Sequence, residues 1–185
     1  MTAADSEALD RLLLARSVKR GHFVLASGRT STFYIDCRLT TMSAEGLALI
    51  GRLGLEAIRA QKWAPRSVGG LTMGADPVAY AIAAASASSG QAVDAFSVRK
   101  DVKGHGTARR IEGNFVAGDA VVVVEDVITT GGSALKAVDA VRAEGGTVLG
   151  VLAVVDREEG GREVIEKAGL RITALTTATR LALNS

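Results

Sequence analysis

Residues 121–133 are Val-Val-Val-Val-Glu-Asp-Val-Ile-Thr-Thr-Gly-Gly-Ser, and this stretch sets the fold class. The β-branched run of Ala120–Glu125 predicts a strand buried on both faces, which is typical of parallel sheets. Thr130–Ser133 then leads into a helix that ends at Gly145. Glycines let the backbone turn with its N–H groups exposed, and a helix N-terminus adds partial positive charge. The stretch therefore predicts a strand, a loop and a helix arranged to bind a phosphate monoester.

Segments on both sides of this stretch alternate between strand and helix signals. Short apolar runs predict further strands at Ser67–Leu71, Ala92–Val98, Thr147–Val155 and Arg171–Leu175. Helices are expected after Asp5 and ending near Gly21, after the N-cap Ser43, from Asp76 with Pro77 at the first position, and over Arg162–Ala168. Two short strands, Phe23–Leu25 and Phe33–Asp36, are expected near the N-terminus. This alternation predicts an α/β fold with a parallel sheet, in which ligands bind beyond the carboxyl ends of the strands.

Length and composition exclude several classes of protein. A chain of 185 residues with 48% hydrophobic and 23% charged residues suits one compact domain rather than a disordered chain. Apolar runs are shorter than the roughly 18 residues of a membrane span, and the acidic residues of the first ten positions do not match a signal peptide. The single cysteine, Cys37, favours a reducing cytoplasm, and a net charge of +2 argues against broad nucleic-acid binding. We therefore expect a cytoplasmic protein of one domain, without membrane or nucleic-acid partners.

Two groups of charged residues are placed for chemistry at the strand ends. Glu125 and Asp126 precede the glycine loop, where adjacent carboxylates suit neighbouring hydroxyls or a hydrated Mg²⁺. Residues 99–110 hold five Lys or Arg against one Asp, so this stretch has a net charge of +4 and the rest of the chain −2. Such a cluster suits an anion with more charge than one phosphate, such as diphosphate. The alternatives are an ordinary strand–turn–helix with a hydroxyl cap, and a solvated basic loop or weak RNA-contacting patch.

Aromatic and arginine side chains are candidates for binding a flat heterocycle that carries a carboxylate. Phe33 and Tyr34 follow a Ser-Gly turn, and aromatic faces stack on flat rings, although such clusters are more often packing. Arg157 follows the strand that ends at Val155 and can bind a carboxylate with two parallel hydrogen bonds. An alternative that the sequence supports equally well is that Arg157 lies on the surface and pairs with Glu158 or Glu159.

Four motifs, spread along the chain from about Gly21 to Gly161, resemble those of a known enzyme family. Residues 121–133 resemble the phosphoribosyl-diphosphate motif of type I phosphoribosyltransferases: an apolar strand, two acidic residues and a Thr/Gly/Ser loop. Residues 99–106, Arg-Lys-Asp-Val-Lys-Gly-His-Gly, resemble the flexible catalytic loop of orotate phosphoribosyltransferases, and residues 23–36 resemble their N-terminal hood. Asp156-Arg157 matches the pair that contributes an orotate-contacting arginine in that family. Ala26 and Met73 depart from the pattern, because some bacterial members have lysines there.

The resemblance implies a type I phosphoribosyltransferase fold, with a central, mainly parallel sheet flanked by helices. A small N-terminal hood is expected over about residues 1–40 and the core of the single domain over about 41–185. The implied reaction transfers ribose 5-phosphate from 5-phospho-α-D-ribose 1-diphosphate to orotate, giving orotidine 5′-phosphate and diphosphate in pyrimidine (UMP) biosynthesis. The resemblance also implies a homodimer in which the basic 99–110 loop reaches the partner's active site.

The same resemblance assigns site residues by their type of contact. The expected catalytic residues are Lys103, Glu125 and Asp126. Diphosphate contacts are expected from Arg99, Lys100, Lys103 and His105. The ribose 5-phosphate end is expected at Glu125, Asp126, Val127, Ile128, Thr129, Thr130, Gly131, Gly132 and Ser133. Orotate contacts are expected from Thr129, Arg157, Phe33 and Tyr34. Mg²⁺ is the expected cofactor, held mainly by the substrate, with a contact through water to Asp126.

Two other functions remain open at this point. A purine phosphoribosyltransferase would share the loop at 125–133 but lack the Lys103-Gly104-His105 loop and the aromatic hood. A non-catalytic sensor that binds phosphoribosyl diphosphate and regulates transcription would need a nucleic-acid surface. Outside residues 99–110 the chain is net acidic, and no added helix-turn-helix segment is evident.

Overall fold

The computed structural model of the protein describes residues 2–24, 30–100 and 110–183. A six-stranded sheet is formed by β3 (Ser67–Leu71), β4 (Asp94–Val98), β5 (Ile111–Gly113), β6 (Ala120–Ile128), β7 (Thr147–Asp156) and β8 (Ile172–Thr177). A separate antiparallel pair is formed by β1 (Val18–Val24) and β2 (Thr30–Ile35). The helices are α1 (Ala3–Arg16), α2 (Arg38–Thr41), α3 (Ala44–Ala60), α4 (Ala75–Ser86), α5 (Gly132–Ala143) and α6 (Gly161–Lys167). Among these described residues no helix is long and apolar enough to cross a membrane.

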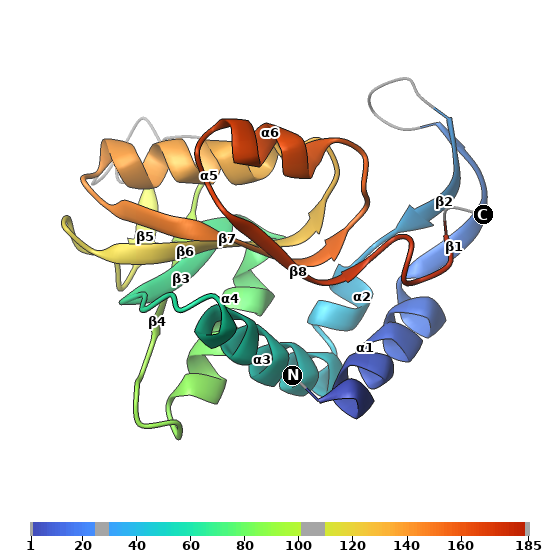
Figure 1. Cartoon of the computed structure of the whole chain (residues 1–185), viewed down its shortest axis with the longest axis horizontal. Helices are drawn as coiled ribbons and strands as arrows, with labels where there is room; N and C mark the ends of the chain where they lie inside the picture. The colour runs from blue at the N-terminus through green and yellow to red at the C-terminus, as the bar shows by residue number, and fades with distance from the viewer. Residues whose placement is uncertain (1, 25–29, 101–109, 184–185) are drawn as a thin grey trace.

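Helices cover both faces of the six-stranded sheet. Figure 1 shows α5 and α6 on one face and α3 and α4 on the other. Side chains of β6 alternate between the two layers: Val122 and Val124 pack with α3 and α4, whereas Val121 and Val123 pack with α5. All four valines are fully buried, which confirms the predicted strand with two buried faces.

The order of the strands places a crevice at the centre of the sheet. The order is β5-β4-β3-β6-β7-β8, and every neighbouring pair is parallel except β4 with β5. The chain builds outward from β3 toward β5 and then, in the other direction, from β6 toward β8. Ligands bind where the direction of winding reverses, outside the carboxyl ends of the strands. The predicted α/β fold with a mainly parallel sheet is confirmed, and its switch point lies between β3 and β6.

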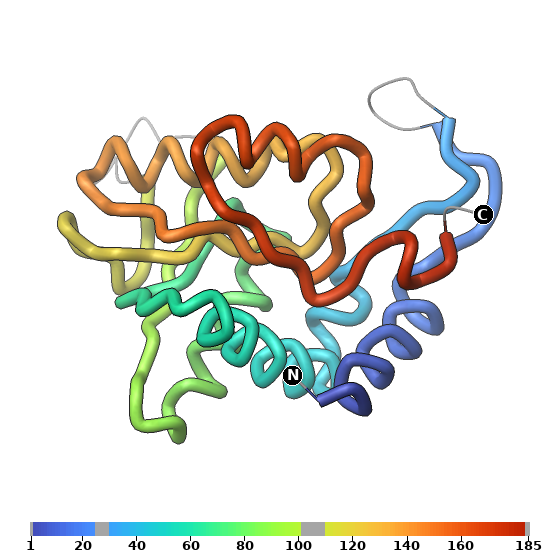
Figure 2. Tube along the Cα trace, viewed as in Figure 1, coloured from blue at the N-terminus to red at the C-terminus, as the bar shows by residue number. Residues whose placement is uncertain are grey.

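The first and last segments of the chain meet at the small β1–β2 sheet. Figure 2 shows the C-terminal trace running beside β1. The Arg20 side chain donates to the carbonyl of Ala182 at 3.0 Å, and Arg180 pairs with Asp10 at 2.6 Å. The division into a hood of residues 1–40 and a core of 41–185 stays a prediction.

Several expected boundaries differ from the structure, and the short elements α2 and β5 were not expected. The expectation of a helix ending near Gly21 is wrong: α1 ends at Arg16, because the chain from Val18 pairs with β2. Helix α4 begins at Ala75, so Pro77 lies within its first turn, where no N–H is required. Strand β5 follows the basic stretch and pairs antiparallel with β4, which the sequence did not indicate. Strand β6 continues to Ile128, because its pairing with β7 continues that far.

Candidate active site

A cavity of about 420 Å³ opens at the switch point between β3 and β6. Its walls come from residues 34–38 at and after the end of β2, residues 71–74 at and after the end of β3, and residues 125–127, 129 and 133 around the end of β6. Lys100 and Arg157 complete the lining. The structure therefore brings side chains from four of the predicted motifs to one cavity, at the sheet edge where α/β proteins bind ligands.

The carboxyl groups of Glu125 and Asp126 lie inside this cavity. Glu125 is buried, and its Oε1 atom has no hydrogen-bond partner among the described residues. Burial raises the pKa of Glu125 to about 8, the charge of Asp126 adds to the rise, and Lys100 opposes it. Burial also raises the pKa of Asp126, although its Oδ1 atom accepts the backbone N–H of Val127 at 2.8 Å. A buried and a partly buried carboxyl group with open oxygen atoms can hold the hydroxyl groups of a ligand.

The absence of a side chain at Gly74 leaves room for the carboxyl group of Asp126. A Cβ atom at Gly74 would lie 2.5 Å from Oδ1 of Asp126, which is closer than real Cβ contacts. Gly74 follows the cis peptide bond between Thr72 and Met73 and precedes α4. The backbone after β3 can approach the carboxyl only because residue 74 has no side chain.

A second, smaller hollow of about 40 Å³ lies beside the cavity, within the loop that joins β6 to α5. Its lining residues are Glu125, Val127, Ile128, Thr129, Thr130, Gly131, Gly132, Ser133 and Ala134. Gly131 has a left-handed backbone with φ of 79°, and α5 begins at the next residue. The N-terminus of α5 and the loop hydroxyls surround the hollow with hydrogen-bond donors, which suits a phosphate group. Glu125, Val127, Thr129 and Ser133 line both spaces, so a single ligand can reach from one to the other.

Arg157 is buried beside the cavity, with 4% of its side chain exposed. Its guanidinium group lies over the ring of Phe33, 4.7 Å from the centroid. One terminal nitrogen pairs with Glu159 at 2.6 Å and donates to Oγ of Ser31 at 3.3 Å. The pairing with Glu159 that the sequence left open is present, but Arg157 is not a surface residue.

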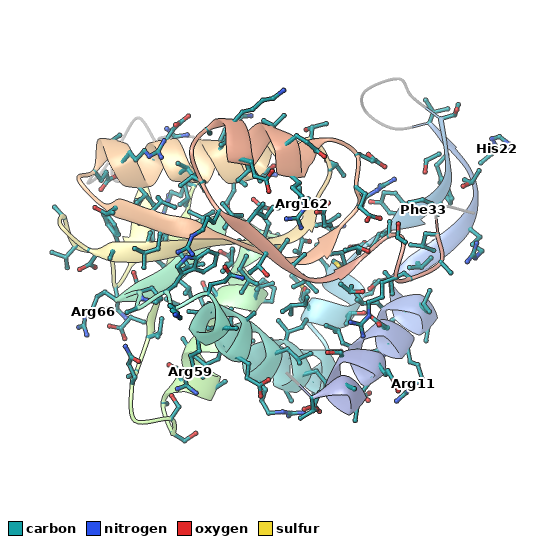
Figure 3. All side chains as sticks on the ribbon, in the orientation of Figure 1. Arg11, His22, Phe33, Arg59, Arg66 and Arg162 are labelled. Atoms are coloured by element: carbon teal, nitrogen blue, oxygen red, sulfur yellow. The ribbon has the colours of Figure 1, made fainter. Side chains whose placement is uncertain are left out.

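The two aromatic residues of β2 have different surroundings. Tyr34 lines the cavity, is 40% exposed and has its ring centroid 5.8 Å from that of Phe23. Phe33, labelled in Figure 3, is buried beneath Arg157 and is not among the residues that line the cavity. Successive side chains of a strand point to opposite faces, so only one of the two can face a ligand directly.

The basic stretch is described only at its two ends. Lys100 lines the cavity. Arg99 instead pairs with Glu112 across the β4–β5 hairpin at 2.9 Å and is not among the lining residues. Lys103 and His105 lie outside the described residues.

Sequence reasoning missed the contribution of the segment after β2. Asp36 and Arg38 form a bidentate ion pair on the cavity wall, and Cys37 lies between them. Burial raises the pKa of the Cys37 thiol well above its usual value, so Cys37 is not a thiolate nucleophile. The signal available in the sequence was an acidic and a basic residue two positions apart at a strand end.

The cavity can accept a hydrated metal ion but does not enclose one by itself. In the described parts of the chain, no group of three or more His, Cys, Asp or Glu side chains could hold a metal. Asp126 does offer a carboxylate oxygen on the cavity wall, which is the kind of ligand atom that Mg²⁺ prefers, whereas both oxygens of Asp36 are paired with Arg38. This donor set fits an ion that receives most of its ligands from water and from a bound phosphate compound.

Comparison with known proteins identifies the family. Residues 43–174 match the family model described as the phosphoribosyl transferase domain. The orotate phosphoribosyltransferase of Aquifex aeolicus is 47% identical over 184 residues, which cover 98% of this chain and 100% of that protein. The chain belongs to the orotate phosphoribosyltransferase family. Membership makes it a pentosyltransferase, and it confirms the resemblance inferred from the four motifs.

Solved structures agree with this membership in the orotate phosphoribosyltransferase family. The Mycobacterium tuberculosis orotate phosphoribosyltransferase in complex with 5-phospho-α-D-ribosyl 1-diphosphate has a TM-score of 0.82 and 45% identity. That match covers 97% of this chain and 99% of the other. An adenine phosphoribosyltransferase from Leishmania donovani has a TM-score of 0.65 at 18% identity, a likeness that concerns the fold alone.

Proposed function

We propose that this chain transfers ribose 5-phosphate from phosphoribosyl diphosphate to orotate, giving orotidine 5′-phosphate and diphosphate for UMP biosynthesis. One observation carries the proposal: the phosphate-sized hollow and the larger cavity share the residues around Glu125. A phosphorylated ribose can then lie with its 5′-phosphate in the loop and its ring beside the carboxyl groups. Membership in the orotate phosphoribosyltransferase family supports the choice of substrates.

Catalysis of this reaction depends mainly on stabilising the charges that develop on the ribose and on the leaving diphosphate. Breaking the bond between C1 and the diphosphate oxygen builds positive charge on the ribose and negative charge on the leaving group. Glu125 and Asp126 hold the ribose hydroxyls, and the 127–133 loop binds the 5′-phosphate through its backbone and hydroxyl donors. At neutral pH Glu125 retains its proton for the larger part, so it can donate to a hydroxyl oxygen as well as accept. Mg²⁺ would be held mainly by the substrate and through water by Asp126, and it would supply neutralising charge for the diphosphate.

The orotate end of the site is built around Arg157. We infer that Arg157 binds the carboxylate of orotate, with Thr129 as a second contact and Tyr34 against the ring. Phe33 acts through Arg157, because its ring supports the guanidinium group from below. The substrate carboxylate then shares or replaces the contact that Glu159 makes with Arg157.

The diphosphate end involves the basic stretch. We propose that Lys100, Lys103 and His105, together with Arg99, bind the leaving diphosphate, and that the 99–110 loop acts across a homodimer. Lys103→Ala should lower kcat by at least about 10²-fold, the scale of losing one aimed donor, and an unchanged kcat would refute that role. Mixing a Lys103 variant with an Asp126 variant, each inactive alone, should restore part of the activity if the loop acts in the partner subunit.

The single cysteine is buried and free, which supports a cytoplasmic location.

The test of the proposed function follows the loss of orotate absorbance. The protein is incubated with orotate, phosphoribosyl diphosphate and Mg²⁺, and a parallel reaction contains a purine base in place of orotate. Turnover that requires both orotate and phosphoribosyl diphosphate supports the proposal. Turnover with the purine base alone would contradict it.

A further inference from the structure

The ion pair between Asp36 and Arg38 lies on the wall of the substrate cavity. Nε of Arg38 donates to Oδ1 of Asp36 at 2.8 Å, and a terminal nitrogen donates to Oδ2 at 3.0 Å. The backbone N–H of Arg38 also donates to Oδ1, at 3.2 Å. The guanidinium is therefore held in one orientation before any ligand binds, which reduces the entropy lost when it makes further contacts.

This pairing leaves most of the guanidinium available. A guanidinium has five N–H donors, and the two side-chain bonds to Asp36 use two of them. The side chain of Arg38 is about half exposed and borders the same cavity as Met73, Gly74 and Asp126. Asp36 is the main cause that raises the pKa of Arg38, and Asp126 adds a smaller contribution. Arg38 in turn offsets part of the rise that burial causes in the pKa of Asp126.

The shape of the site determines which part of the substrate Arg38 can meet. Phosphoribosyl diphosphate carries anionic groups at both ends, and the loop hollow receives the single phosphate. Arg38 does not line that hollow but borders the larger cavity. The described side chains of that cavity include two other cations, Lys100 and Arg157, and Arg157 is buried with 4% of its side chain exposed, whereas about half of Arg38 is exposed. Residues 72–74, on the wall beside Arg38, carry no charge of their own. Among the described residues, Lys100 and Arg38, which keeps N–H donors beyond the two that Asp36 accepts, are thus the exposed cations that can meet the second anionic end.

We propose that Arg38 binds the diphosphate end of the substrate, and that Asp36 orients Arg38 and competes with the diphosphate for its charge. The inference rests on the proposed function, because that function places a diphosphate in this cavity. Arginine suits the role, since its planar group bonds two oxygens of a phosphate at once. Removal of the guanidinium and removal of the competing carboxylate should then change diphosphate affinity in opposite directions.

The experiment measures binding of inorganic pyrophosphate by calorimetric titration, without Mg²⁺ and at low salt. Arg38→Met should weaken pyrophosphate binding by about tenfold, the scale of one charge-assisted contact at a partly exposed site. Arg38→Lys, which keeps the charge but not the planar group, should lie between Arg38→Met and the wild type. Asp36→Asn should tighten binding about twofold or more, because it removes the competing charge. The KM for orotate should stay within twofold of wild type in the Arg38 variants.

The matched control is Arg52→Met, since Arg52 on α3 is also half exposed and pairs with Asp5 at 3.1 Å, away from the cavity. Its affinity for pyrophosphate should stay within twofold of wild type. An Arg38→Met protein with wild-type affinity, or an equal loss in both methionine variants, would overturn the inference. If Asp36→Asn weakens pyrophosphate binding as much as Arg38→Met does, Asp36 only orients Arg38. That result would contradict the competition between Asp36 and the diphosphate. If Arg38→Met does not fold, Arg38→Lys and Asp36→Asn still decide. A wild-type protein without orotate turnover contradicts the proposed function, whereas the titration tests Arg38 separately.

Discussion

Replacing Gly74 with alanine should lower activity without lowering stability. The added methyl group would displace the carboxyl group of Asp126 but would leave the backbone conformation unchanged. Gly74 has φ of −63° and ψ of −40°, which alanine adopts without strain. The new Cβ atom would lie 2.5 Å from Oδ1 of Asp126, whereas ordinary contact begins at 3.4 Å. The carboxyl must therefore move by about 0.9 Å, away from the position at which it accepts the Val127 N–H. A displacement of about 1 Å in a positioned group costs on the order of 10²-fold in rate.

Two measurements test the Gly74→Ala prediction. The loss of orotate absorbance should give a kcat/KM about 10²-fold below wild type, while the urea midpoint stays equal or rises slightly, since Gly→Ala at a compatible position stabilises by about 0.4–1 kcal/mol. Gly70→Ala is the contrasting variant: its Cβ would meet the backbone carbonyl of Val124 in the neighbouring strand, so it should lose stability. A Gly74→Ala protein with kcat/KM within fivefold of wild type would refute the reasoning.

Three further predictions concern stability. Burial raises the pKa of Glu125 from 4.5 to about 8, so the folded protein keeps a proton that the unfolded chain loses. The free energy of unfolding should therefore fall by a few kcal/mol as pH rises from about 5 to about 8, and Glu125→Gln should remove this fall in urea titrations. Gly150→Ala would place a Cβ against the Trp63 ring with too little room, so it should cost about 1–3 kcal/mol of stability with both KM values unchanged. An unaltered urea midpoint would count against this prediction. Arg162→Ala removes a partner, at 3.0 Å, of the buried Asp156 carboxylate, and should cost about 3 kcal/mol in thermal or urea unfolding. Arg162→Lys should recover part of that loss, and equal losses in both variants would show that the charge is not what matters.

The order of the longer elements was predictable because each carries its own local signal, whereas the short elements α2 and β5 were not expected. The β-branched run before Glu125 and the glycines after it predict a strand, a turn and a helix without reference to the rest of the chain. Boundaries set by partners were not predictable in this way. Val127 and Ile128 belong to β6 because they pair with β7, and the segment from Val18 is a strand because it pairs with β2.

The candidate site was predictable where the family motifs are long, and not where the relevant pattern is short. Tyr34, Glu125 and Arg157 do meet at one cavity, although they are distant in sequence. The burial of Phe33 beneath Arg157 follows from the alternation of side chains along β2 and from the path of a distant loop. The cavity position of the Asp36–Arg38 pair could not be read from two charges at a strand end, since such pairs are common on surfaces.

The β1–β2 sheet is held against the large sheet by apolar side chains that both share. Phe33, Ile35, Leu181 and Leu183 belong to the same apolar cluster as α3 and one face of the large sheet. Exposing four such side chains would cost on the order of 6–12 kcal/mol, which is comparable to the whole stability of a typical domain. The β1–β2 sheet, which carries Tyr34 and Ile35 of the cavity wall, is therefore anchored to the same core as the large sheet. A substrate that enters the cavity meets this part of the wall already in position, so its binding energy is not spent on ordering that part of the wall.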